Sequence, residues 1–559
     1  MLREFNFTAR SHEGWRNALL VTAFGAMMLL PAIIKGVPRG NDLPHHYRTA
    51  LSFYNSIGNG NLYPGWNAEA TSGYGDVTFR FYPPAIYYAM AFSRALTGNW
   101  YDSSLLLFAF LSAAGGLGVY LWARAHLDGN LAMWAGIFYT FVPFHINELY
   151  QAFLLPEYAA SALLPFSFAF TELVCERQRP KDVFGLAASY ALLILTHLPL
   201  AIIGSLALLI YTLLLIKKRT WMKTVMRLGL GVTVGLAASA RYWVTMIAEL
   251  PWLKAAPSAP SSWFDYRLNF LFWKSVEGST SWWANVLAIA TALMFLPAVA
   301  LLLRNKTGSS ARRLRAVAIL MLFSFFMATP LSLPVWSVLP FLQRVEFPWR
   351  WLAITSVCGP VLLASSIPHW VEKARNNRRP AVIAAVGCVL ISAALTFLQI
   401  VRGATYLPRS TFDSLVKQVG SSNSLNFWLP QWASVDARVM KSEIEIGDRP
   451  FAINLWGPER REFQVGPGFP SEARVRTFYY PCWVARVGSA RMPTRADTDG
   501  ALLISLPGDA VSVNLEFSEP PRTSMAMAAS IIGWALIGAG LCICSYKEKL
   551  ESESRIEMI

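Results

Sequence analysis

The sequence predicts a mainly α-helical, polytopic membrane bundle with a β-rich extracytoplasmic domain near its C-terminal end. Hydrophobic residues make up 54% of the 559 residues, and charged residues only 15%, whereas a soluble domain carries about 25% charge. The apolar residues gather in runs of roughly the 18 to 20 residues that a helix needs to cross a bilayer. Between residues 400 and 523 these runs give way to short alternating segments such as 502–506 and 511–517, a pattern typical of strands.

We expect about twelve transmembrane helices from these runs. The predicted ranges are 17–34, 104–123, 131–147, 158–174, 184–196, 199–216, 226–245, 285–303, 316–333, 350–368, 380–399 and 524–544. Every other connection is rich in Lys and Arg, which predicts that both chain ends lie on the cytoplasmic side. This alternation accounts for the net charge of +15, so nucleic acid is not expected as a partner.

The sequence divides into three predicted regions. Residues 1–399 form the bundle, with a long first outer loop at 35–103; residues 400–523 form the β-rich domain; and residues 524–559 form the last span and a cytoplasmic tail.

The apolar stretch 184–216 is too long for one span and is interrupted at Thr196–Pro199, which predicts a short helical hairpin. His197 would then lie at the floor of an outward-facing cavity, where irregular backbone is tolerated at membrane depth.

The stretch Gly40–Tyr47 brings ionisable groups together directly after the first predicted span. Asp42 is the best candidate for a general base, because it is a carboxylate at a helix mouth on the outer side. The competing interpretation is that Asp42 only caps the following helix, since Asp is a favoured N-cap. His45 and His46 are candidates for substrate contact, although adjacent helical residues point to different faces.

The helix after Asp42 is predicted to lie along the membrane surface. Its apolar residues recur on one face, as a surface helix requires. They are Leu43, Tyr47, Ala50, Leu51 and Tyr54.

Two carboxylates bracket the second outer loop, Glu148 and Glu157. A carboxylate beside the bilayer is costly unless it has a partner, so each is a candidate metal ligand or substrate contact, against the alternative of a solvated helix end. His197 is a candidate by the same reasoning, with a helix–helix hydrogen bond as the alternative.

Three arginines near the outer side are candidates for binding phosphate: Arg80, Arg344 and Arg350. Their planar guanidinium groups match phosphate geometry. The alternative for each is that the side chain extends to the membrane surface while its stem stays in apolar surroundings.

This layout resembles the GT-C superfamily of multi-pass glycosyltransferases, in which an Asp follows the first span and acidic residues occupy the second outer loop. Four short motifs resemble, more narrowly, bacterial membrane proteins labelled with a 6-pyruvoyl-tetrahydropterin synthase-related domain. These motifs are Gly40–Tyr47, Phe81–Pro84, Leu195–Pro199 and Glu346–Trp351. The late segment Phe478–Ala485 is similar to a Tyr-Pro-x-Trp signature of β-domains in related large membrane proteins.

The resemblance implies a glycosyltransferase in the bacterial inner membrane that uses a polyprenyl-phosphate sugar donor on the periplasmic side. It implies Asp42 as base and Glu157 or Glu148 as the second-loop acid, with a glycan, lipid or protein acceptor. A divalent metal (Mg or Mn) is the one cofactor that the resemblance allows. The chain lacks the Asp-x-Asp and Trp-Trp-Asp motifs of oligosaccharyltransferases, a departure that weakens the expectation of metal dependence and of a peptide acceptor. The alternatives are a transporter of lipid-linked glycans and a non-catalytic envelope-assembly protein. Transporters often show paired halves with broken helices at matching positions, which this sequence does not show.

Overall fold

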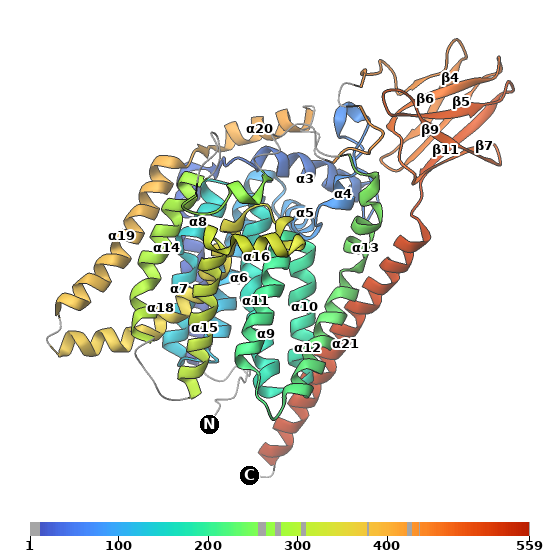
Figure 1. Ribbon diagram of the computed structural model, residues 1–559. Helices are drawn as coiled ribbons and strands as arrows, with labels where there is room; N and C mark the ends of the chain where they lie inside the picture. Colours follow the sequence, from blue (N-terminus) through green and yellow to red (C-terminus); the bar gives the residue numbers. More distant parts are fainter. Residues whose placement is uncertain are drawn as a thin grey trace.

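The computed structural model describes residues 12–254, 264–273, 281–302, 309–376, 379–421, 428–434 and 437–557. Parts of the connection between the predicted spans 226–245 and 285–303 lie outside these ranges. A helical bundle carries a two-sheet β-domain at one end, and helix α21 (Pro521–Glu557) runs from that domain along the bundle to the opposite end (Figure 1).

The other helices of the bundle follow in chain order, with short 3₁₀ turns between some of them. They are α1 (His12–Met27), α2 (Leu30–Lys35), α3 (Leu43–Gly58), α4 (Thr78–Phe81), α5 (Ala85–Thr97), α6 (Trp100–Ala123), α7 (Gly129–Thr140), α8 (Pro143–Tyr150), α9 (Leu155–Arg177), α10 (Pro180–Thr196), α11 (Leu198–Leu215), α12 (Trp221–Ala238), α13 (Ala240–Glu249), α14 (Ser281–Leu302), α15 (Ser309–Met327), α16 (Leu333–Val338), α17 (Pro340–Gln343), α18 (Leu352–Arg375), α19 (Arg379–Gly403) and α20 (Arg409–Ser421).

Each predicted span overlaps one helix or two consecutive helices, and the count of twelve spans is not confirmed. Among the described residues, six helices are long and apolar enough to cross a membrane, or eight if two bent pairs each count as one span. The bends are 69° between α12 and α13, and 89° between α15 and α16. Several predicted spans are shorter or broken because helices end where proline follows, as α7 does before Pro143.

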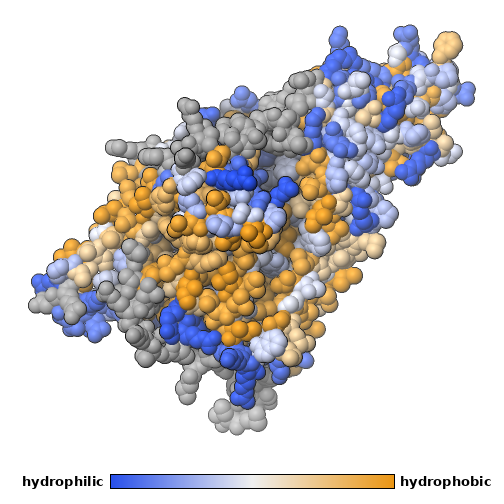
Figure 2. Space-filling view, in the orientation of Figure 1, coloured by the Kyte–Doolittle hydropathy of each residue, from blue (hydrophilic) through white to orange (hydrophobic). Residues whose placement is uncertain are grey.

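The surface of the bundle agrees with a membrane location. A broad apolar band covers the bundle, and hydrophilic residues gather at its two ends and on the β-domain (Figure 2). Large apolar side chains on α21 stay exposed, among them Ile531, Ile532 and Leu536, as side chains that face lipid do.

The hairpin predicted within 184–216 is present. His197 is extended (φ −157°, ψ 107°) and stands between α10 and α11. Pro199, in the first turn of α11, has no N–H to donate, so the helix restarts there. The backbone of His197 forms hydrogen bonds with both helices. Its N–H donates to Leu193 O of α10 at 3.1 Å, and its carbonyl accepts from Ala201 N of α11 at 3.0 Å.

Two antiparallel sheets form the β-domain. One has the strand order β3-β6-β10-β9 and the other β4-β5-β11-β7-β8. The strands are β3 (Ile444–Glu445), β4 (Phe451–Trp456), β5 (Arg460–Val465), β6 (Ser471–Phe478), β7 (Trp483–Val487), β8 (Ala490–Met492), β9 (Thr494–Ala496), β10 (Ala501–Leu506) and β11 (Val511–Phe517). The two predicted strands are β10 and β11. The first part of the predicted domain is instead helical, because α20 packs against α3.

The first outer loop joins the bundle to the β-domain. Trp66 is fully buried, and its ring lies 5.7 Å from the ring centroids of both Trp483 and Phe517. Glu459 accepts hydrogen bonds from the backbone N–H groups of Gly65 and Trp66. The loop therefore completes the core of the β-domain.

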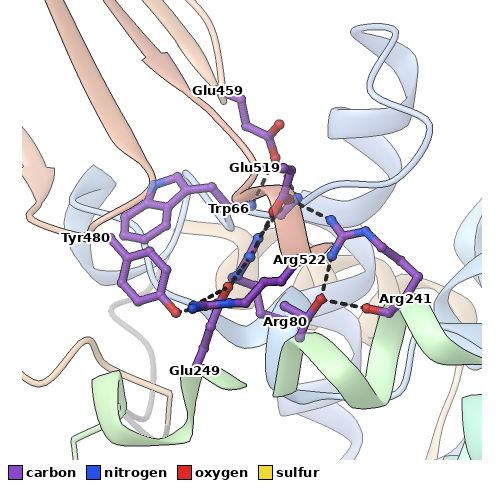
Figure 3. Close-up of polar contacts among 10 residues, drawn as sticks. Trp66, Arg80, Arg241, Glu249, Glu459, Tyr480, Glu519 and Arg522 are labelled. Atoms are coloured by element: carbon purple, nitrogen blue, oxygen red, sulfur yellow. Dashed lines mark hydrogen bonds and ion pairs between the residues drawn. The ribbon is translucent and has the colours of Figure 1, made fainter. Parts of the chain in front are cut away.

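A buried cluster of charges lies where the outer loop, the bent helix and the β-domain meet (Figure 3). Arg80 of α4 donates to Glu249 at the end of α13 and to Glu519 just after β11, with Nη2 at 2.6 Å from Glu249 Oε1 and at 2.9 Å from Glu519 Oε2. Tyr480 donates to Glu249 at 2.6 Å, and Arg241 donates to Glu519 at 2.6 Å. Four donated bonds thus hold Arg80 between two carboxylates.

The loop before Asp42 is clamped from two sides. Strand β1 (Val37–Pro38) pairs with β2 (Tyr406–Leu407), and the N–H groups of Asn41 and Asp42 both donate to Ala152 O. Gly40 has φ +31°, and a Cβ there would lie 2.3 Å from Phe153 Cβ. Only glycine allows so close an approach of the two chains.

Replacing Glu249 by Gln should destabilise the protein, because the substitution leaves the buried charge of Arg80 with one carboxylate fewer. Breaking a buried pair costs about 3–5 kcal/mol, so we expect the melting temperature in detergent to fall by several degrees. Glu516→Gln is the matched control, since its pair with Arg486 is more than half exposed on both sides and exposed pairs contribute little. Equal melting temperatures for the two variants would contradict a structural role for the cluster.

Gly40→Ala should displace the loop that carries Asp42. The new Cβ would meet the backbone of residue 153 at 2.6 Å, and strain of this kind costs about 1–3 kcal/mol. Hydrogen exchange of residues 36–46 should quicken in this variant. Gly58→Ala is the control, because nothing lies within 4 Å of its added Cβ; equal exchange in both variants would show that the close approach at Gly40 is not needed.

Candidate functional site

Asp42 lies half-buried at the junction between the clamped loop and α3. Its side chain makes no capping hydrogen bond to the helix, so the capping interpretation finds no support in the geometry. Burial raises the pKa of Asp42 to about 6, while the positive charge of Arg350 lowers it and the charge of Glu157 raises it further. Asp42 is therefore within electrostatic range of both residues.

Arg350 and Glu157 form a buried ion pair. The Arg350 Nε donates to Glu157 Oε2 at 2.9 Å, and Arg350 Nη1 donates to Val345 O at 2.6 Å. Their side chains are 9% and 1% exposed. The second oxygen of Glu157, Oε1, has no hydrogen-bond partner among the described residues. One carboxylate oxygen is thus buried without a hydrogen-bond partner among the described residues, beside a fixed guanidinium group.

Glu148 lies in a more enclosed position on α8. It is fully buried, accepts a hydrogen bond from Ser161 Oγ at 2.9 Å, and lies 3.1 Å from His145 Nδ1. Burial raises the pKa of Glu148 well above its ordinary value, which favours the neutral acid. Its environment therefore suits a supporting role near Arg350 better than that of an ionised base.

The two adjacent histidines differ in burial. His46 is 2% exposed, and its ring lies 6.0 Å from Tyr82 and 6.5 Å from Phe153. His45 is less buried and lies 6.2 Å from the same Tyr82 ring. Burial lowers the pKa of both, to about 4 for His45. As neutral imidazoles at pH 7, they can bind a substrate by hydrogen bonds but not by charge.

His197, at the break between α10 and α11, is a further candidate residue near Arg350. It is 7% exposed, within electrostatic range of Arg350 and His46. The structure thus brings Asp42, Glu157 and His197 around one residue, Arg350. Their catalytic and binding roles stay predictions.

Tyr82 was assigned no role from the sequence, yet it lies within electrostatic range of Asp42, Arg350 and Glu157. Burial, and then the charge of Asp42, raise the pKa of Tyr82 above its ordinary value. Its position follows from Pro83 and Pro84, which end α4 and leave Tyr82 extended (φ −99°, ψ 136°). The signal in the sequence was the Phe81–Pro84 motif, which was noted only for its resemblance.

Two of the three candidate arginines lie apart from this group. Arg80 is held by Glu249 and Glu519, so its donors are already engaged and phosphate binding is not expected of it. Arg344 is exposed, which gives it no fixed place in the buried group. Only Arg350 lies among the other candidates.

The residues present do not fit a divalent metal. No group of three or more His, Cys, Asp or Glu residues within the described ranges can hold one. Arg350 also occupies the position beside Glu157 that a cation would take. We therefore derive no step through Mg or Mn.

Comparisons with solved structures give distant likenesses. ArnT from Cupriavidus metallidurans bound to undecaprenyl phosphate is 15% identical over 74% of this chain and 75% of its own, with a TM-score of 0.44. The arabinofuranosyltransferase AftD from Mycobacteria is 16% identical over 70% of this chain and 26% of its own, with a TM-score of 0.43. The oligosaccharyltransferase of Archaeoglobus fulgidus is 13% identical over 74% and 56% of the two chains, with a TM-score of 0.38. At these scores the likenesses carry no argument about residues or chemistry.

No curated protein matches the chain. A family model described as "6-pyruvoyl-tetrahydropterin synthase related domain; membrane protein" matches residues 79–403, which is more than half of the sequence. This range includes Glu157, His197 and Arg350 but begins after Asp42. The chain therefore belongs to the 6-pyruvoyl-tetrahydropterin synthase related family of membrane proteins.

Proposed function

We propose that this protein is a membrane glycosyltransferase of the GT-C type, which transfers a sugar from a polyprenyl-phosphate donor to an acceptor at the end of the bundle that carries the β-domain. The observation that carries the proposal is the half-buried, uncapped carboxylate of Asp42 within electrostatic range of the buried Arg350–Glu157 pair. A base and a fixed positive charge at one place are what sugar transfer from a phosphate needs.

The reaction would proceed by direct displacement. Asp42 takes the proton of the acceptor hydroxyl while the oxygen of that hydroxyl bonds to the anomeric carbon of the donor sugar. The bond between that carbon and the phosphate oxygen breaks, and polyprenyl phosphate leaves with the bonding electron pair. Arg350 stabilises the negative charge that develops on the phosphate.

The remaining residues would shape the site. Glu157 binds the Nε of Arg350 and so fixes the direction of the guanidinium group. Tyr82, His46 and His197 offer hydrogen bonds to sugar hydroxyls, and the Nδ1 atoms of both histidines have no partner among the described residues. The broad apolar surface of the bundle (Figure 2) would receive the polyprenyl chain.

We further propose that the reaction occurs on the periplasmic side of a bacterial inner membrane. The start of α1 contacts the connection after α6, where Asn17 donates to Gly129 O. The end of α21 contacts α10 through Glu548 and Lys181. These contacts lie among the Lys- and Arg-rich connections that the charge rule assigns to the cytoplasm.

Asp42→Asn should abolish transfer while leaving the fold intact. Loss of general-base catalysis lowers a rate about 10²–10⁴-fold, so we expect turnover to fall at least a hundredfold. Purified protein in nanodiscs would be supplied with a panel of polyprenyl-phosphate sugars and glycan acceptors, and released polyprenyl phosphate would be measured by mass spectrometry.

Asp102→Asn is the matched control for this experiment. Asp102 is a carboxylate in the first turn of α6 that pairs with Arg409 at the surface, and its loss should leave turnover unchanged. Retained turnover in Asp42→Asn would exclude Asp42 as base. If the wild type turns over no donor in the panel, the result would favour the alternatives, a transporter of lipid-linked glycans or a non-catalytic envelope-assembly protein.

The pH profile of transfer should follow the ionisation of Asp42. Its pKa is raised to about 6, and only the carboxylate form accepts a proton. The value of kcat/KM should therefore fall about tenfold per pH unit below 6 and level off above it. Asp42→Glu should keep such a limb at a shifted pH, whereas a profile that is flat between pH 5 and 7 would contradict the assignment.

A further inference from the structure

A cavity with one apolar and one charged wall lies at the end of the bundle opposite the β-domain. It is enclosed by α6, α9, the start of α10 and the end of α21, and has a volume of about 270 Å³. A single water needs only about 10–15 Å³ on such a measure. The cavity therefore has room for a lipid headgroup and the start of a chain.

One wall of this cavity is apolar. It consists of Leu121, Trp122, Phe166, Ala169, Phe170 and Leu173. The indole N–H of Trp122 is already donated to Glu172 Oε2 at 3.0 Å. Its polar atom is thus satisfied within the protein, and the side chains of this wall offer an acyl chain apolar contact.

The other wall carries charges of both signs. Arg177, Arg179, Lys181, Asp182 and Glu548 line it. Glu548 lies 2.9 Å from Lys181 Nζ and 3.7 Å from Arg179 Nη1, and these pairs join α21 to α10. The basic side chains at this wall suit a phosphate.

Asp182 indicates which further chemical group a ligand of this cavity must have. Its residue is only 7% exposed, and its Oδ2 has no hydrogen-bond partner among the described residues. A buried carboxylate oxygen without a donor is costly, and it would repel a ligand that is only anionic. The missing partner is a hydrogen-bond donor, which the primary ammonium group of a ligand would supply.

We propose that this cavity binds a zwitterionic phospholipid whose headgroup holds both a phosphate and a primary amine, as in phosphatidylethanolamine. The phosphate lies against the basic side chains, the ammonium donates to Asp182, and one acyl chain follows the apolar wall. Basic pockets between helices at this side of a membrane bind lipid headgroups in other proteins. The cavity is separate from the candidate site around Asp42, so the inference does not depend on the proposed transfer reaction.

Delipidated protein would be titrated with dioleoyl-phosphatidylethanolamine, -choline and -glycerol, and first-lipid affinities measured by native mass spectrometry. The quaternary ammonium of choline has no N–H to donate, so we expect at least about tenfold tighter binding of the ethanolamine lipid, the effect of one hydrogen bond to a charged group. Asp182→Asn should remove this preference. Glu176→Gln is the matched control, because Glu176 pairs with Lys217 and does not line this cavity; it should keep the preference.

Three results would overturn the inference. Equal affinities of wild type for the ethanolamine and choline lipids would show that Asp182 meets no ammonium. An unchanged preference in Asp182→Asn would place the selective contact elsewhere. Tighter binding of the glycerol lipid than of the ethanolamine lipid would identify a site for anionic lipid.

Discussion

The architecture depends on the burial of Arg80 between two carboxylates. Burial alone would lower its pKa, but the hydrogen bonds to Glu249 and Glu519 hold the pKa above its ordinary value, so the group stays charged. A buried charge is tolerated only while its partners stay in place. Three segments that are distant in sequence, the outer loop, the bent helix pair α12–α13 and the linker before α21, therefore keep one relative arrangement.

The ion pairs of Arg80 also help to fix the geometry of the candidate site. Tyr82 follows Arg80 by two residues, and Phe81 O accepts a hydrogen bond from Tyr242 on α13 at 3.1 Å. The ion pairs thus hold Tyr82 near Asp42 from one side. From the other side, the β1–β2 ladder and the contact of Gly40 with residue 153 hold the loop that carries Asp42. Arg350 and Glu157 then come from two further helices, so the site joins segments that no local motif could contain.

The difference between local patterns and contacts of distant segments explains what the sequence could and could not predict. Periodicity and hydropathy are local, and they predicted the helices, the strands β10 and β11 and the break at His197. Charge alternation predicted that α1 begins and α21 ends at one end of the bundle. The partners of Arg80 lie 169 and 439 residues away, and no spacing rule connects them, so Arg80 was taken for a phosphate ligand. Tyr82 was missed for the same reason, since its neighbours Asp42, Glu157 and Arg350 meet it only in the folded chain. The number of spans is not confirmed, because hydropathy does not show where proline shortens or bends a helix.

Hydrogen bonding distinguishes Glu249 from the carboxylates of the candidate sites. Glu249 is fully buried, and side chains donate to both of its oxygens, Arg80 to Oε1 and Tyr480 to Oε2; it holds helices together. Asp42 has no capping bond, Glu157 keeps one oxygen without a partner, and so does Asp182 at the opposite end of the bundle. A buried polar atom without a partner destabilises the protein that contains it, and a bound ligand can supply the missing bond. Both proposals, a phosphate-linked sugar near Arg350 and an amine-bearing lipid near Asp182, use this argument together with the geometry of their sites.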